Sequence, residues 1–94
     1  MKESSGINLL HWAAIANRPE VIPALSLAGV PINEQDEFGF TPLMYAATLD
    51  FGDTELVKTL LRAGADPKIR NAEGRTAREQ AKYFRHTQIE DAMR

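Results

Sequence analysis

Side chains that could support catalysis or metal binding are few in this 94-residue chain, and they lie far apart. His11 and His86 are 75 positions apart and no cysteine accompanies them, so they do not form a convincing set of metal ligands. Ser4 and Ser5 precede His11, but nothing in the sequence assigns them an acid partner or an oxyanion hole. The glycines stand one at a time, without a glycine-rich phosphate-binding loop. We therefore expect no catalytic residue, no cofactor and no metal.

Three acidic residues, Asp50, Asp53 and Glu55, lie close together and offer the oxygen ligands that calcium prefers. The segment lacks the full ligand series of a calcium-binding loop, so turn and cap chemistry is favoured. We expect Asp53 to cap the following helix and Glu55 to lie near its positive end.

Basic and aromatic residues gather near the end of the chain, where a nucleic acid could be imagined to bind. These are Arg70, Arg75, Arg78, Lys82, Tyr83, Phe84 and Arg85. Four acidic residues dilute them, and the net charge of the chain is −2, whereas nucleic-acid-binding domains are typically strongly basic. A nucleic-acid partner is not expected.

The composition is ordinary for a globular protein, with 44% hydrophobic and 26% charged residues. No apolar run approaches the roughly 20 residues that span a bilayer, and the start lacks the layout of a secretory signal. We expect a soluble chain without membrane contact, cytoplasmic if the sequence is complete, with the compartment otherwise open. Charge is uneven, −5 over residues 1–61 and +3 over 62–94. This asymmetry could steer a partner or let copies associate head to tail, but charge that keeps exposed faces soluble is the favoured interpretation.

A pattern recurs along the chain. Residues 39–47 read Gly-Phe-Thr-Pro-Leu-Met-Tyr-Ala-Ala, residues 6–14 follow the same layout 33 positions earlier, and Gly74-Arg75-Thr76-Ala77 begins it again 35 positions later. Thr41 can cap a helix and Pro42 suits its first position, so each copy begins a short helix. Such a period indicates stacked units.

Together with Leu-Leu-Arg-Ala-Gly-Ala-Asp at 60–66, these motifs resemble the ankyrin repeat over essentially the whole chain. The resemblance implies an all-α solenoid of stacked helix-turn-helix units with a β-turn or hairpin finger at each junction. We expect one domain, 1–94, with repeats at approximately 3–35, 36–70 and 71–94. It also implies that His11 bonds neighbouring loops and that His86 joins one repeat to the next.

Several local features follow. The first inner helix is expected between residues 7 and 16 with Trp12 in its core, and with weaker capping because Asn8-Leu9 replaces Thr-Pro. Pro23 predicts a late start or a kink in the outer helix over 19–28. Asp36 and Asn71 are expected to form the finger turns.

The last unit is more polar than the others and predicts a cap on the stack. Its polar residues at positions of the buried helix face are Arg78, Glu79, Gln80 and Lys82. The first repeat has no comparably polar unit, so the domain either sits behind another domain or exposes an apolar end.

The resemblance implies that finger tips and the concave side of the inner helices bind proteins. The matching positions are Gln35, Glu37, Phe38, Phe40, Thr48, Leu49, Arg70, Ala72, Glu73 and Arg75. Phe38 and Phe40 flank the finger glycine, and we expect at least one of them to be exposed as an interface anchor. Phe51 is expected to pack between helices.

We therefore predict a non-catalytic module that binds a protein partner, whose identity the sequence does not give. One alternative is a regulatory or targeting segment of a larger enzyme. Another is a self-associating scaffold, and a monomer or weak self-association is expected.

Overall fold

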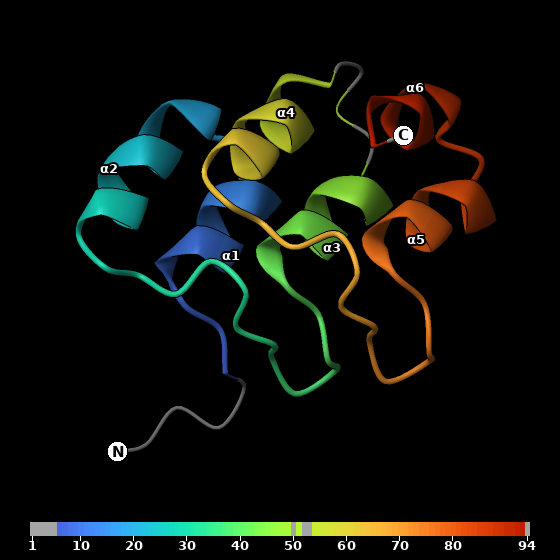
Figure 1. The fold of residues 1–94 in the computed structure, drawn as a ribbon, viewed down its shortest axis with the longest axis horizontal. Coiled ribbons are helices and arrows are strands. Elements are labelled where there is room, and N and C mark those ends of the chain that lie inside the picture. The colour runs from blue at the N-terminus through green and yellow to red at the C-terminus, as the bar shows by residue number, and fades with distance from the viewer. Residues whose placement is uncertain (1–5, 50, 52–53, 94) are drawn as a thin grey trace.

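The computed structural model describes residues 6–49, 51 and 54–93, and within them the chain forms helices and turns with no strand. The helices are α1 (Leu9–Ile15), α2 (Ile22–Leu27), α3 (Pro42–Thr48), α4 (Glu55–Arg62), α5 (Ala77–Tyr83) and α6 (Thr87–Ala92), with a 3₁₀ turn at Pro19–Val21 before α2. Each odd-numbered helix pairs with the next even-numbered one. The inner helices α1, α3 and α5 lie side by side in one layer, and α2, α4 and α6 form the outer layer (Figure 1). This is the expected all-α stack.

Side chains at the predicted positions cap the inner helices. Thr41 Oγ1 accepts a hydrogen bond from the Met44 amide (3.3 Å), and Thr76 Oγ1 accepts one from the Glu79 amide (3.2 Å). The Glu79 carboxylate in turn accepts from the Thr76 amide, and this bond, chiefly, lowers the pKa of Glu79. The expectation of weak capping at Asn8 was wrong. Asn8 Oδ1 accepts from the amides of Leu10 (2.8 Å) and His11 (3.1 Å), and the Asn8 amide donates to His11 Nδ1.

The first outer helix starts late, as Pro23 predicted. Residues Pro19–Val21 form the 3₁₀ turn, and Pro23 occupies the first turn of α2, where a missing amide removes no helical hydrogen bond.

The core runs through the stack between the two helix layers. Its completely buried members include Leu10, Ile22, Leu43 and Leu60. Trp12 was wrongly expected in this core, because 57% of its surface is exposed. Phe51 is also 37% exposed and is not enclosed between helices.

The third repeat carries charged side chains at positions that are buried in the second repeat. Arg78 and Lys82 take the places of Leu43 and Ala47, and both charged side chains are exposed. Arg78 Nε lies 3.8 Å from Glu90 on α6, forming an ion pair between the two last helices. Gln80 departs from the expected polar cap surface, because it is only 1% exposed.

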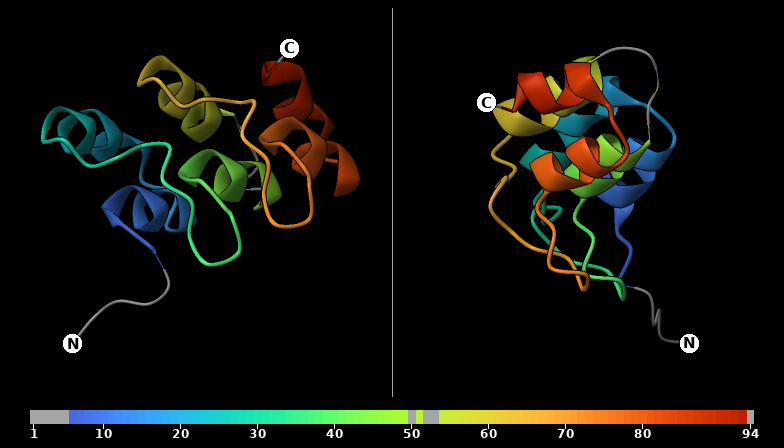
Figure 2. Two further views of the ribbon diagram at one scale, coloured as in Figure 1. Left: turned by 60° about the horizontal axis from the view of Figure 1, so that its bottom comes forward. Right: turned by 90° about the vertical axis from the view of Figure 1, so that its right-hand side faces the viewer.

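The fingers are the loops between the helix pairs, and they project from one side of the helices (Figures 1 and 2). We call residues 29–39 the first finger and 64–74 the second finger. Asp36 Oδ1 accepts hydrogen bonds from the amides of Phe38 and Phe40, each at 2.9 Å. Asn71 Oδ1 likewise accepts from Glu73 (2.9 Å) and Arg75 (3.0 Å). The two predicted turn residues are confirmed.

Candidate functional site

Hydrogen bonds fix the two fingers against each other. The Ala72 amide donates to the Phe38 carbonyl (3.1 Å), and the Asp66 amide donates to Asn33 Oδ1 (2.8 Å). Gln35 Nε2 donates to the carbonyls of both Gly39 (2.9 Å) and Arg70 (2.8 Å). The finger junction is therefore a defined surface rather than two independent loops.

Gly39 permits this close approach. Its φ is +76°, and a Cβ built on it would lie 2.6 Å from the Ala72 backbone nitrogen. Any side chain here would push the fingers apart, so glycine is required both for conformation and for space.

A hollow of about 360 Å³ lies at the finger junction, lined by Phe38, Phe40, Tyr45, Ala72 and Glu73. Phe38 is 59% exposed, whereas Phe40 is half-buried with its ring centroid 4.9 Å from that of Tyr45. The expectation that at least one of the two phenylalanines is exposed is confirmed for Phe38. The hollow is an apolar depression with a carboxylate at its edge.

Tyr45 forms the wall of this hollow on the side of α3. Its hydroxyl donates to Asp36 Oδ2, and its ring packs edge-on against His11 at 5.8 Å between centroids. Burial, followed by the bond to Asp36, raises the pKa of Tyr45 well above its ordinary value, so the hydroxyl stays protonated. The ring is thus held at both its hydroxyl and its edge.

Both histidines have structural partners. His11 Nε2 donates to the Phe40 carbonyl (2.9 Å), while its Nδ1 accepts from the Asn8 amide. His86 Nδ1 donates to the Ala47 carbonyl (2.9 Å) and so joins the third repeat to the second. The roles that the resemblance implied for both residues are confirmed.

Charged groups on the second finger pair locally. Arg70 lies 3.1 Å from Glu79 and also donates to the Gly74 carbonyl. Arg75 lies 2.8 Å from Glu73, and its guanidinium stacks 4.2 Å from the centre of the Tyr83 ring. All four charged side chains are at least partly accessible, so a partner's charges can compete for these ion pairs.

The structure brings most of the predicted binding residues to the fingers. Phe38, Phe40, Ala72 and Glu73 share the hollow, Gln35 and Arg70 bridge the fingers, and Glu37 is exposed beside them. Arg75 lies at the base of the second finger.

Two predicted residues lie elsewhere. Thr48 ends α3 at the opposite end from the finger, and its hydroxyl donates to the Met44 carbonyl (2.8 Å) and accepts from Gln80 Nε2 (2.7 Å). Leu49 follows it and is half-buried. Tyr45 was missed, although an aromatic residue one helical turn after the capping Thr41 faces back toward the finger.

In the part of the chain that the structure describes, no three His, Asp or Glu side chains converge as metal ligands. Asp50 and Asp53 lie outside the described residues, so the Asp53 cap and the calcium site with Glu55 that the sequence suggested lie outside them too. Among the helices described, none combines the length and apolarity that crossing a bilayer requires.

Comparison with known families identifies the repeated pattern. The family model for ankyrin repeats, in three copies, matches residues 10–91.

Relatives match over most of this chain but over little of their own length. Palmitoyltransferase Hip14 of Drosophila melanogaster is 41% identical over 73 residues, covering 77% of this chain and 11% of that protein. Palmitoyltransferase AKR1 of Lachancea kluyveri is 42% identical over 66 residues, covering 69% and 9% respectively. A putative ankyrin repeat-containing protein of Treponema pallidum is 32% identical over 78 residues, covering 82% and 26%. The chain thus spans about a quarter or less of each of these relatives.

Proposed function

This chain belongs to the ankyrin-repeat family, and on that premise we propose that it is a non-catalytic module that holds a protein partner at its fingers and along the concave side of its inner helices. Ankyrin repeats generally mediate interactions between proteins, which supports this class of function. We also propose that 1–94 forms a single domain with repeats at approximately 3–35, 36–70 and 71–94.

The exposed ring of Phe38 beside the hollow is the observation that carries the proposal. Large aromatic side chains at a preformed depression are typical anchors of protein interfaces. Hydrogen bonds of Ala72 and Gln35 already fix the finger junction. The conformational entropy that the loops lose when a partner binds should therefore be small. The hollow suits an apolar side chain of the partner, with a basic group beside it toward Glu73.

A second candidate function is the regulatory or targeting segment of a larger enzyme. It is favoured by the similarity to two palmitoyltransferases, of which this chain matches about a tenth. The sequence of the complete reading frame separates the candidates, because an enzyme requires a catalytic domain beyond these residues.

Binding can be tested by selecting peptides from a random display library against the domain and titrating the best one by fluorescence anisotropy. Phe38→Ser should weaken binding about 30-fold, corresponding to an anchor worth about 2 kcal/mol. Phe84→Ser removes an exposed ring outside the hollow and serves as the matched control. Equal affinities for the Phe38 and Phe84 variants would remove the support for a finger site.

A further inference from the structure

Aromatic rings supply most of the lining of the hollow at the finger junction. Phe38, Phe40 and Tyr45 carry rings, and the lining is completed by Ala72 and Glu73. The rings of Phe40 and Tyr45 lie 4.9 Å apart between centroids and meet at 48°, so they form a corner of the hollow. The face of an aromatic ring carries partial negative charge, so a hollow lined by rings attracts cations as well as apolar groups.

Carboxylates add negative charge around these rings. Glu73 lines the hollow itself, and its side chain is 62% exposed. On the side of α3, burial is the first cause of the raised pKa of Tyr45, its hydrogen bond to Asp36 is the second, and the negative charges of Asp36 and Glu37 raise this pKa further. A cation in the hollow would therefore be attracted by carboxylates of both fingers.

Arg75 is the basic side chain bonded to Glu73, but it points toward α5 rather than into the hollow. Its guanidinium lies 2.8 Å from Glu73, donates to Gln80 and stacks 4.2 Å from the centre of the Tyr83 ring. Accessible ion pairs of this kind are weak, so a second cation can share the Glu73 carboxylate. None of the five described residues that line the hollow is basic.

We propose that the hollow binds a methylated lysine side chain of the partner protein. This inference rests on the proposed function and names the chemistry of the partner's anchor. A trimethylammonium group carries a positive charge inside a shell of apolar methyl groups, so it can contact the rings and the Glu73 carboxylate together. An unmethylated ammonium is compact and strongly hydrated, and it would lose water against the rings.

The hollow has the size and the order that one such head group requires. Its volume of about 360 Å³ lies at the lower end of the roughly 300–1,000 Å³ typical of small-ligand sites. The Tyr45 hydroxyl is held by Asp36, and the backbone of Phe38 is held by Ala72. Rings that are positioned before binding lose little entropy, which favours selective binding of a single side chain.

Chemical-shift titration of the ¹⁵N-labelled chain with N-acetyl-lysine amide tests the proposal. The probe is used unmethylated, trimethylated, and as a neutral isostere in which carbon replaces the charged nitrogen. We expect the trimethylated form to bind about tenfold more tightly than either of the others, with the largest shifts at Phe38, Ala72 and Glu73. Equal binding of the three forms, larger shifts outside the fingers, or no detectable binding of the trimethylated form would each overturn the proposal.

Phe38→Leu separates a cation site from an ordinary apolar site. Leucine keeps an apolar side chain but removes the ring, so the preference for the trimethylated form over the neutral isostere should fall about fivefold. Phe84→Leu removes an exposed ring outside the hollow and is the matched control. Glu73→Gln should reduce the same preference while the neutral isostere binds as before, and circular dichroism confirms that the variants are folded. A preference that survives both Phe38→Leu and Glu73→Gln would refute the assignment.

The inference and the proposed function fail in different ways. The peptide selected from the display library contains only unmodified amino acids, so it tests whether the fingers bind a peptide at all. If Phe38→Ser weakens that peptide while lysine methylation makes no difference to binding, the proposed function stands and the methylated lysine is excluded. If Phe38→Ser leaves the selected peptide unaffected and the trimethylated probe does not bind, both proposals fail.

Discussion

The backbone amide of Ala72 donates a hydrogen bond to the carbonyl of Phe38 over 3.1 Å, joining the tips of two fingers from successive repeats. The bond fixes Phe38 next to Ala72 and Glu73, so the hollow exists before any partner arrives.

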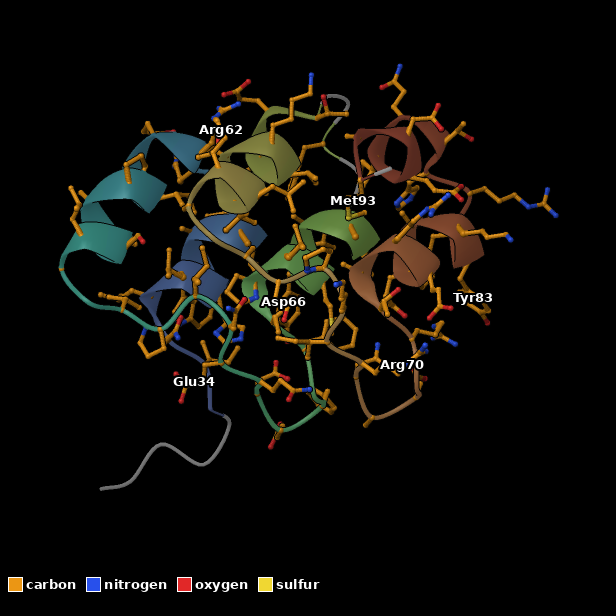
Figure 3. All side chains as sticks on the ribbon, in the orientation of Figure 1. Glu34, Arg62, Asp66, Arg70, Tyr83 and Met93 are labelled. Carbon is orange, nitrogen blue, oxygen red and sulfur yellow. The ribbon has the colours of Figure 1, made fainter. Side chains whose placement is uncertain are left out.

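Figure 3 shows Arg70 on the finger side of the molecule and Arg62, on the outer helix α4, on the far side.

Gly39→Ala should destabilise the domain more than Gly74→Ala. Both glycines have positive φ, +76° and +82°, so each substitution introduces backbone strain of about 1–3 kcal/mol. Only at Gly39 does the new Cβ collide with the Ala72 nitrogen, while nothing lies within 4 Å at Gly74. The difference between the unfolding free energies of the two variants, measured in urea, gives the cost of the collision with Ala72. Equal losses of stability would show that the close contact between the fingers does not affect stability.

Phe38→Ser and Phe40→Ser should have different effects on stability. Phe38 is largely exposed, so its replacement should change the free energy of unfolding by no more than about 0.5 kcal/mol. Phe40 packs on Tyr45, so Phe40→Ser should lower the free energy of unfolding by about 1–2 kcal/mol. Thermal and urea unfolding compare them, and a large loss at Phe38 would make it a packing residue instead of a binding residue.

Tyr45→Phe should make stability less sensitive to alkaline pH. Because folding raises the pKa of Tyr45, its protonated hydroxyl contributes to the free energy of unfolding. This contribution is complete below the unfolded-state pKa of about 10 and is lost as the pH rises above that value. The variant is less stable at neutral pH because Asp36 loses its hydroxyl donor, but the difference from the parent should narrow above pH about 10. Urea unfolding at neutral and alkaline pH measures this difference, and a constant gap would contradict the assignment.

Asn8→Ala should destabilise the first repeat by about 1 kcal/mol, because two amides of α1 lose their cap. Thr41→Ala removes the corresponding cap of α3 and provides the comparison. Chemical unfolding monitored by circular dichroism gives both values. If Asn8→Ala left the free energy of unfolding unchanged while Thr41→Ala lowered it, the Asn8 cap would be weak after all.

The features predicted correctly from the sequence are those fixed by local chemistry. Thr41, Pro23 and Asp36 act on backbone groups within a few residues, so their types and spacing predict the cap, the late helix start and the turn. The fingers and their exposed phenylalanine follow from the same short motifs.

The errors concern residues whose environment depends on the neighbouring repeat. Trp12 lies on an apolar stripe, but the stripe is covered only where a repeat precedes it. Gln80 is polar yet buried, because Thr48 and Arg75 satisfy its amide group. The place of Thr48 at the binding surface stays a prediction, but its bond to Gln80, which joins two repeats, was not foreseen. Pattern alone does not supply these long-range partners.

The most direct measurement for the finger site is a map of amide chemical-shift changes when the selected peptide is added to the ¹⁵N-labelled domain. We predict that the largest changes fall on Phe38, Phe40, Ala72 and Glu73, with little change on α2 and α4. Changes concentrated on those outer helices, with the fingers unaffected, would contradict the account.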